Sequence, residues 1–208
     1  SEVLTENQSD QDTTKFNLIN SRATFSTSKD STKINYEVGY DINVENAYGL
    51  RIKDKQQQIG DYAIFSSAEY KPVESLTIRP GLRYAYNTVY QAPLVPSLNV
   101  RYKIKNNFTL RASYAKGFRA PSLKDLYFYF VDINHNIKGN ENLKAEYSDN
   151  YILTANYSKI KENRIYKTEV SAFFNDIKNL ITLAQTSGSE YSYINIGKYK
   201  TLGVQLNN

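Results

Sequence analysis

The stretch SLNVRYKIKNNFTLRASYA, residues 97–115, contains two runs in which apolar and polar side chains alternate. In the first run Leu98 and Val100 fall on one side of an extended chain, and Asn99 falls on the other. The polar segment KNN at 105–107 separates the two runs. Because a period of two is the repeat of a β-strand, this stretch predicts two antiparallel strands joined by a short turn, each with one apolar and one polar face.

The same alternation recurs along most of the chain, so we predict an all-β fold, an antiparallel meander of about ten strands of roughly 9 to 13 residues each. Besides the opening stretch, the clearer runs lie at 33–43, 75–86, 151–157 and 166–174, and weaker ones lie near 15–28, 61–71, 191–197 and 200–206.

The composition argues against a large conventional core. Only 40% of the 208 residues are hydrophobic, and the mean hydropathy is -0.58. The chain has 19 Tyr and 9 Phe, which favour strands with half-exposed aromatic positions, and it has no Cys, which excludes disulfides and cysteine nucleophiles. The net charge of +5 comes from cations interspersed with 21 acidic residues, so we expect no nucleic-acid partner.

The connections between the predicted strands form two alternating classes. In an antiparallel meander, short turns then lie at one end of the sheet and long loops at the other. Short polar turns are predicted at 28–32, 71–75, 105–107, 158–163 and 197–200, and longer connections near 45–60, 87–95, 117–145 and 184–190.

This asymmetry, with one apolar and one charged face on each strand, is typical of a transmembrane β-barrel wall. Apolar residues would face lipid, and tyrosines at strand ends would form the girdle at the membrane interface. A soluble β-sandwich is the alternative, but its strands are usually shorter. The predicted girdle comprises Tyr70, Tyr86, Tyr102, Tyr114 and Tyr157, and the predicted wet face carries Glu37, Arg79, Arg83, Arg101, Arg111 and Glu169.

Sequence motifs for enzymatic chemistry are missing, so we predict that the protein is not an enzyme. The single histidine, His135, excludes a histidine-rich metal cluster, and no serine-hydrolase, zinc-protease or phosphate-loop motif occurs. Asp132, Asn134 and Asn136 are spaced like ligands of a calcium loop, but Ile137 and Leu143 occupy the positions that need a glycine and a carboxylate.

The segment around His135 carries the most specific signal in the chain. YAKGFRAPSLKDLYF at 114–128, followed by GNENLKAEYS at 139–148, resembles the barrel signature of TonB-dependent outer-membrane receptors. The residues that carry the resemblance are Phe118, Arg119, Ala120 and Pro121 in the first part, and Asn140, Glu141, Asn142, Leu143, Lys144, Ala145 and Glu146 in the second.

The resemblance implies a larger protein. Receptors of this family have a barrel of about 22 strands that surrounds a plug domain. Residues 1–208 would then be part of the barrel domain, and the plug domain and the C-terminal strands would not be present in this chain. The resemblance also implies the outer membrane of a Gram-negative bacterium, contact with its lipid, and TonB as a partner that acts through the plug.

Within this family the segment is most similar to that of haem and haemoprotein receptors, which place a histidine in this loop. The resemblance makes His135 the candidate axial ligand of haem iron, with Tyr127 and Tyr129 as secondary candidates. Haem would be the transported ligand and not an intrinsic cofactor, His135 would bind metal only through haem iron, and a haemophore or haemoprotein would be a possible partner.

Several alternatives stay open from the sequence. His135 could be solvated or hydrogen bonded to a neighbouring asparagine. Arg119 could pair with Asp125 or Glu146 to fix the base of the loop, or it could contact a haem propionate. The protein could instead be a ferric-siderophore or cobalamin receptor of the same family, or a small structural or adhesive outer-membrane barrel.

Overall fold

The computed structural model describes residues 2–3, 12–27, 33–131, 136–161 and 164–208. Strands dominate this part of the chain, as the alternating sequence predicts. The long strands are β2 (Asp12–Ser26), β3 (Ile34–Gly49), β4 (Gln56–Val73), β5 (Leu76–Asn87), β6 (Val95–Lys105), β7 (Phe108–Arg119), β10 (Glu146–Lys161), β11 (Arg164–Ser187) and β12 (Glu190–Asn207). The short elements are β1 (Glu2–Val3), the 3-10 turn η2 (Lys53–Lys55), α1 (Leu123–Tyr127), β8 (Tyr129–Val131) and β9 (Asn136–Lys138).

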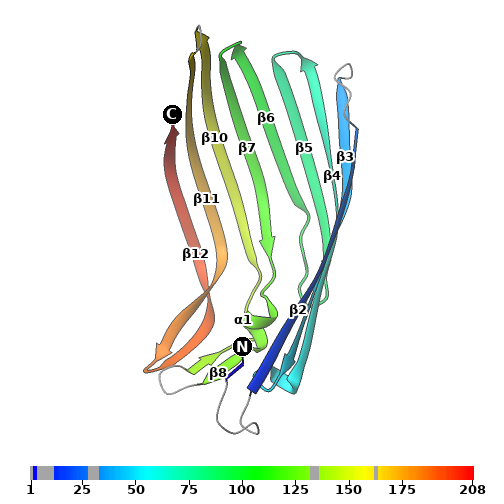
Figure 1. Ribbon diagram of the computed structural model, residues 1–208, viewed down its shortest axis with the longest axis vertical. Helices are drawn as coiled ribbons and strands as arrows, with labels where there is room; N and C mark the ends of the chain where they lie inside the picture. Colours follow the sequence, from blue (N-terminus) through cyan, green and yellow to red (C-terminus); the bar gives the residue numbers. More distant parts are fainter. Residues whose placement is uncertain (1, 4–11, 28–32, 132–135, 162–163) are drawn as a thin grey trace.

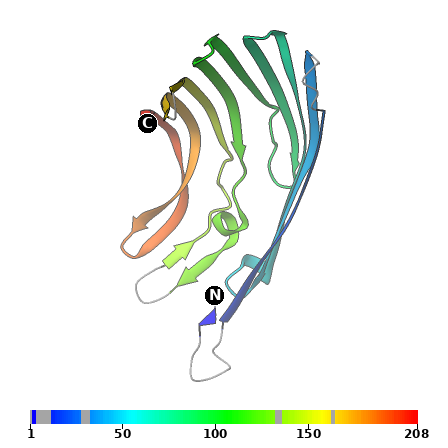
Figure 2. The ribbon, with the colours of Figure 1, turned by 45° about the horizontal axis from the view of Figure 1, so that its top comes forward.

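The described strands form one sheet in the order β1-β2-β3-β4-β5-β6-β7-β10-β11-β12-β9-β8. Each long strand pairs antiparallel with its neighbour, and among the described strands only β9 pairs in parallel, with β12. The sheet curves into a trough-shaped wall, with β2 and β12 at its two sides (Figures 1 and 2). The predicted all-β antiparallel fold is confirmed.

The connections separate to the two ends of the wall as predicted. The turns at 74–75 and 106–107 lie at the upper end in Figure 1, and the connections at 50–55, 88–94 and 120–145 lie at the lower end, which we call the mouth. No helix among the described residues is long and apolar enough to cross a membrane.

The predicted strand lengths of roughly 9 to 13 residues are confirmed for β5, β6 and β7 but were too short for the other long strands. β11 has 24 residues, and the loops predicted near 45–60 and 184–190 are mostly continuations of strands beyond the alternating region. The turn predicted at 197–200 is wrong, because Lys198 and Lys200 lie inside β12 and face Lys178 and Asp176 of β11. Near the mouth the strands stay paired although many of their residues are polar, because the backbone hydrogen bonds between strands do not require an apolar face.

The two faces of the wall differ in character. The convex face carries strongly exposed apolar side chains such as Ile64, Tyr84 and Leu202. The concave face carries ion pairs between strands, with Arg83 3.0 Å from Asp41 and 3.3 Å from Asp61. A similar pair joins Arg79 to Glu37 at 3.4 Å. This division is the one expected when one face meets lipid and the other meets water.

Glycine allows close packing at one point on the concave face. A Cβ on Gly39 would lie 2.4 Å from the Phe65 ring and 2.5 Å from the carbonyl oxygen of Ala23. The ring therefore covers bare backbone, and the Arg22 guanidinium lies 5.0 Å from the same ring. Only glycine fits this position without moving the neighbouring strand.

The one hydrophobic cluster of the described residues lies at the mouth and not within the wall. It consists of Ala47, Ile52, Ile59, Leu123, Leu126, Leu143 and Ile181. Since the convex side chains point outward and most concave ones are polar, the dry cluster of the described residues forms where the connection between β7 and β10 packs against the strands. That connection, residues 120–145, is the one in which the sequence placed the candidate site.

Candidate functional site

The connection between β7 and β10 begins with two ion pairs of Arg119, the last residue of β7. Its guanidinium lies 2.7 Å from Glu146 and 3.3 Å from Asp125. Both carboxylates are largely buried, at 14% and 12% exposure of the side chain. The predicted pairing of Arg119 with Asp125 or Glu146 is therefore present with both partners, and it joins the two ends of the connection.

The helix α1 follows directly after Pro121, which is fully buried. Ser122 and Asp125 form a capping box, in which each side chain accepts a hydrogen bond from the other residue's backbone N–H. The backbone N–H of Leu123 donates to a carboxylate oxygen of Glu45 at 3.3 Å. This contact ties the start of the helix to β3, so α1 lies over the concave face (Figure 2).

After α1 the chain reaches the connection between β3 and β4. Phe128 forms an isolated β-bridge with Ile52, and the backbone N–H of Tyr129 donates to the carbonyl of Arg51 at 3.0 Å. The Tyr129 hydroxyl donates to the carbonyl of Leu50. This half of the connection is therefore attached to the β3–β4 side of the wall.

The second half is attached to the opposite side. β9 pairs in parallel with the start of β12, where Asn136 faces Glu190. The Asn136 amide donates to the Glu190 carboxylate at 3.1 Å, and the Lys138 ammonium lies 3.5 Å from it. Because β8 pairs with β9, the connection crosses the trough from β3 and β4 to β12.

The return to β10 is held by buried contacts. The Asn140 backbone N–H donates to the carbonyl of Asp125 at 2.8 Å, and its side-chain amide donates to the carbonyl of Tyr193 at 2.8 Å. Leu143 is buried, and its carbonyl accepts a hydrogen bond from the Tyr90 hydroxyl at 3.0 Å. Burial raises the pKa of Tyr90, so this hydroxyl stays protonated and able to donate.

An exposed ion pair supplements this packing. The Lys53 ammonium lies 2.6 Å from Glu141, and both side chains are about half exposed. The hydrogen bond with Glu141 raises the pKa of Lys53. The pair adds a contact between η2 and the return segment, at a position where solvent screens the charges.

The candidate ligands fall in different environments. Tyr127 is partly buried and packs against the hydrophobic cluster, whereas Tyr129 is exposed but has its hydroxyl engaged with Leu50. His135 lies outside the described residues, as do Asp132 and Asn134. Among the described residues, no group of three or more acidic, histidine or cysteine side chains could hold a metal ion.

The remaining motif residues have structural contacts. Phe118 packs against Tyr147 on the convex face, with ring centroids 5.6 Å apart. Ala120 is partly buried at the start of the connection, and Asn142 is exposed with its N–H donating to the Asn140 side chain at 2.9 Å. The aromatic run after α1 is also engaged, since Phe128 packs on Phe16 at 6.1 Å.

Other residues of the site were not identifiable from the sequence. The Arg51 guanidinium lies 4.6 Å from the Phe130 ring, and the Asn195 amide donates to the carbonyls of Lys144 and Asn179 at 3.0 and 2.8 Å. Each joins segments far apart in the chain. Alternation reports which face a residue occupies, but not which distant segment it meets.

These features define the class of protein. A wall with an apolar convex face, a charged concave face and a connection folded across its mouth is part of a transmembrane-type β-barrel. Residues 3–208 match the family described as TonB dependent receptor-like, beta-barrel, and the chain belongs to this family. The characterised proteins of this family are transport receptors.

Relatives and solved structures agree with this assignment. The chain is 28% identical over 161 residues to heme/hemopexin utilization protein C of Haemophilus influenzae, covering 64% of this chain and 23% of that protein. It is 26% identical over 155 residues to the ferric enterobactin receptor of Pseudomonas aeruginosa, covering 67% and 20%. The fold matches the siderophore receptor PirA of Pseudomonas aeruginosa with a TM-score of 0.81 at 20% identity, covering 94% of this chain and 40% of that chain.

The chain thus spans about a quarter or less of the length of these two relatives. The family assignment does not favour a small structural or adhesive barrel, the third of the functions that the sequence left open.

Proposed function

We propose that this chain forms part of an outer-membrane transporter that takes up haem with energy supplied through TonB. Family membership supports the transport role, and the similarity to heme/hemopexin utilization protein C supports haem as cargo. The observation that carries the proposal is the connection across the mouth. It is the segment in which the sequence resembles haem receptors, and it lies where a ligand would enter the trough.

In this proposal His135 supplies the axial ligand for haem iron, and Tyr127 and Tyr129 are the secondary candidates. The described residues have a positioning role. Arg119, Asp125 and Glu146 close the base of the connection, and β8 and β9 attach it to both sides of the wall. With both carboxylates on Arg119, its proposed role is to hold the connection and not to contact a propionate. A haemophore or haemoprotein would deliver the haem.

A ferric siderophore is the second candidate cargo. The similarity to the ferric enterobactin receptor of Pseudomonas aeruginosa, at 26% identity, is close to that of the haem relative. Uptake of such a chelate would not need an axial imidazole, because the siderophore itself supplies the iron ligands. Growth of a strain that carries the full-length receptor, on haem or on ferric enterobactin as the sole iron source, distinguishes the two cargoes.

The direct test is a haem titration of the purified full-length receptor, followed by Soret absorbance. His135→Ala should weaken haem binding by at least about tenfold and shift the Soret band, because a bond to iron is lost. Tyr166→Ala is the control, since this exposed aromatic residue faces Lys159 at the end of the wall away from the mouth and its loss should leave both readouts nearly unchanged. Unaltered binding and spectrum in His135→Ala would reject axial ligation by this residue.

A further inference from the structure

The convex face of β7, β10, β11 and β12 changes from apolar to charged at one level near the mouth. Four lysines, which we call the lysine cluster, lie at this level: Lys116, Lys178, Lys198 and Lys200. The strand register places Lys116 beside Asp149, Asp149 beside Asp176 and Asp176 beside Lys200. Nearer the mouth, Lys178 faces Lys198 directly.

The charges at this level do not cancel. Asp176 is shared by two lysines, with Lys200 at 3.7 Å and Lys198 at 4.0 Å, and Asp149 accepts a hydrogen bond from the Tyr114 hydroxyl at 2.7 Å. Four cations against two carboxylates leave a net charge of +2. Neither Lys116 nor Lys178 forms an ion pair with any residue that the structure describes. Like charges on facing strands repel, so the pair formed by Lys178 and Lys198 favours an added anion.

An apolar groove of about 420 Å³ lies directly beside this level, on the side away from the mouth. The row next to the charges is Tyr114, Tyr151, Phe174 and Leu202, which all line the groove. Ala112 and Ala172 lie in the following row, where their small side chains leave the surface hollow. The site therefore combines an apolar slot with a cationic rim.

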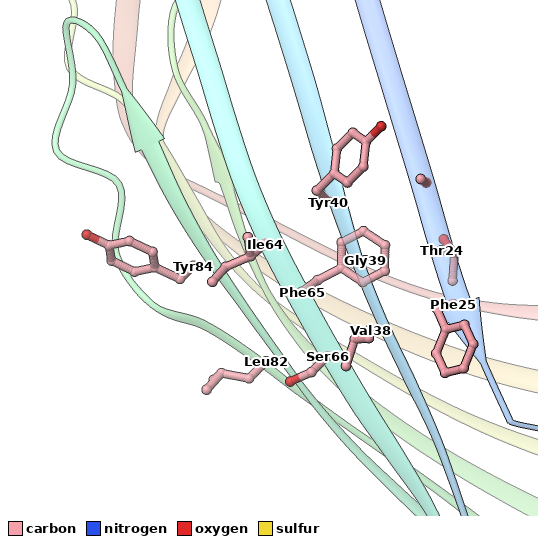
Figure 3. Close-up of a pocket in the computed structure, with 11 residues that line it drawn as sticks. Thr24, Phe25, Val38, Gly39, Tyr40, Ile64, Phe65, Ser66, Leu82 and Tyr84 are labelled. Carbon is pink, nitrogen blue, oxygen red and sulfur yellow. The ribbon is translucent and has the colours of Figure 1, made fainter.

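The other large groove of the convex face provides a contrast within the same wall. It lies over β2 to β5, has a volume of about 670 Å³, and is lined by side chains such as Tyr40, Ile64 and Tyr84 (Figure 3). The next row toward the mouth consists of Ser21, Ile42, Tyr62 and Tyr86, and includes no Lys, Arg, Asp or Glu. In these rows on the mouth side, lysines therefore border the groove over β7 to β12 but not the groove over β2 to β5.

We propose that the lysine cluster and its groove form a binding site for a phosphorylated lipid of the membrane leaflet at the mouth end. The ammonium groups of Lys178, Lys198 and Lys200 bind the headgroup phosphate, and one acyl chain lies in the groove between Tyr114 and Leu202. Lysine suits a phosphate as a compact point charge with three donors. A lipid meets both parts of the site at once, because its phosphate and its acyl chain lie on either side of the membrane interface.

This inference rests on the proposed function only for the placement of the convex face in a membrane, and it holds for either cargo. The test uses the purified full-length receptor in a neutral detergent and measures binding of diphosphorylated lipid A by native mass spectrometry. The combined variant Lys178→Gln, Lys198→Gln and Lys200→Gln should lower the affinity for lipid A by about tenfold or more.

A matched variant keeps the same change in charge but moves it to the opposite end of the wall: Lys105→Gln, Lys159→Gln and Lys161→Gln. It should retain most of the lipid A affinity, and so should the combined variant Lys178→Arg, Lys198→Arg and Lys200→Arg. Ala172→Phe fills the groove and should also weaken lipid A binding. Equal losses in the two glutamine variants, or no loss in either, would overturn the proposal, as would inorganic phosphate binding as tightly as lipid A.

Discussion

Removing the Glu146 side chain should release the connection at the mouth while leaving the wall intact. One carboxylate oxygen of Glu146 accepts hydrogen bonds from Arg119 at 2.7 Å and from the backbone N–H of Ile181 at 2.6 Å. In Glu146→Ala both donors lose this acceptor, and Arg119 retains only the longer contact with Asp125. The two ends of the connection are then no longer joined through one side chain.

The expected magnitude follows from the exposure of each partner. Arg119 is 47% exposed, so solvent screening limits its share to about 0.5–1 kcal/mol. Ile181 is only 8% exposed, so an unpaired N–H there should cost about 1–3 kcal/mol. The two contributions add to about 1.5–4 kcal/mol, which corresponds to roughly a 10- to 900-fold rise in the fraction of molecules with an open connection.

Hydrogen exchange of the full-length receptor measures this opening. The reporter amides are those of Leu126, Gly139 and Asn140, which donate to carbonyls within the connection. Glu141→Ala is the control, because Glu141 pairs with Lys53 at an exposed position and should leave exchange nearly unchanged. Unchanged reporter exchange in Glu146→Ala, or an equal rise in Glu141→Ala, would refute the role of Glu146 as the main fastening.

Three further changes test the packing of the full-length receptor, with the unfolding temperature in detergent as the common measurement except where stated. Leu123→Ala should destabilise the mouth cluster by about 2–5 kcal/mol, because this side chain is fully buried, and local proteolysis of the connection should detect it. Gly39→Ala should destabilise the wall by about 1–3 kcal/mol through the clash with the Phe65 ring, whereas Gly197→Ala, which meets no atom within 4 Å, should have little effect. Arg83→Gln should lower the unfolding temperature at low ionic strength more than at high ionic strength, because the two carboxylates lose their shared cation and added salt screens this interaction; an equal loss at both salt concentrations would contradict that cause.

The sequence predicts the strands of the wall well, because the face that a side chain occupies depends only on its position in the local alternation. Alternation alone assigns Arg79 and Arg83 to one face and Tyr84 to the other, and the register places them there. The interfacial girdle is predicted on the same basis. Strand length is harder to predict, because β3 and β11 end near the mouth in polar residues that show no clean alternation, such as Glu45 and Asn46 in β3 and Gln185 and Thr186 in β11. Gly197 and the adjacent lysines resemble a turn in composition, although they lie within a strand.

The candidate site was only partly predictable. The pairing of Arg119 with Asp125 and Glu146 could be anticipated, because all three belong to motif segments that flank one loop. Attachment of the loop to Ile52 and to Glu190 could not, since these contacts span 54 residues or more and leave no periodic signal. The axial role of His135 remains a prediction.

The location of the buried cluster explains why the recognisable motif lies in a connection and not in a strand. A wall strand needs only a suitable apolar residue at each outward position, so many side chains would serve in place of the exposed Leu202. The connection has to fill a dry space of fixed shape, where Pro121 and Leu123 have almost no exposed surface, and it has to pair Arg119 with two carboxylates. Close packing and buried charge restrict the residue type at each of these positions. The recognisable sequence motif therefore coincides with the residues that are closely packed at the mouth. A ligand that binds the connection would act on the best-packed part of the described chain.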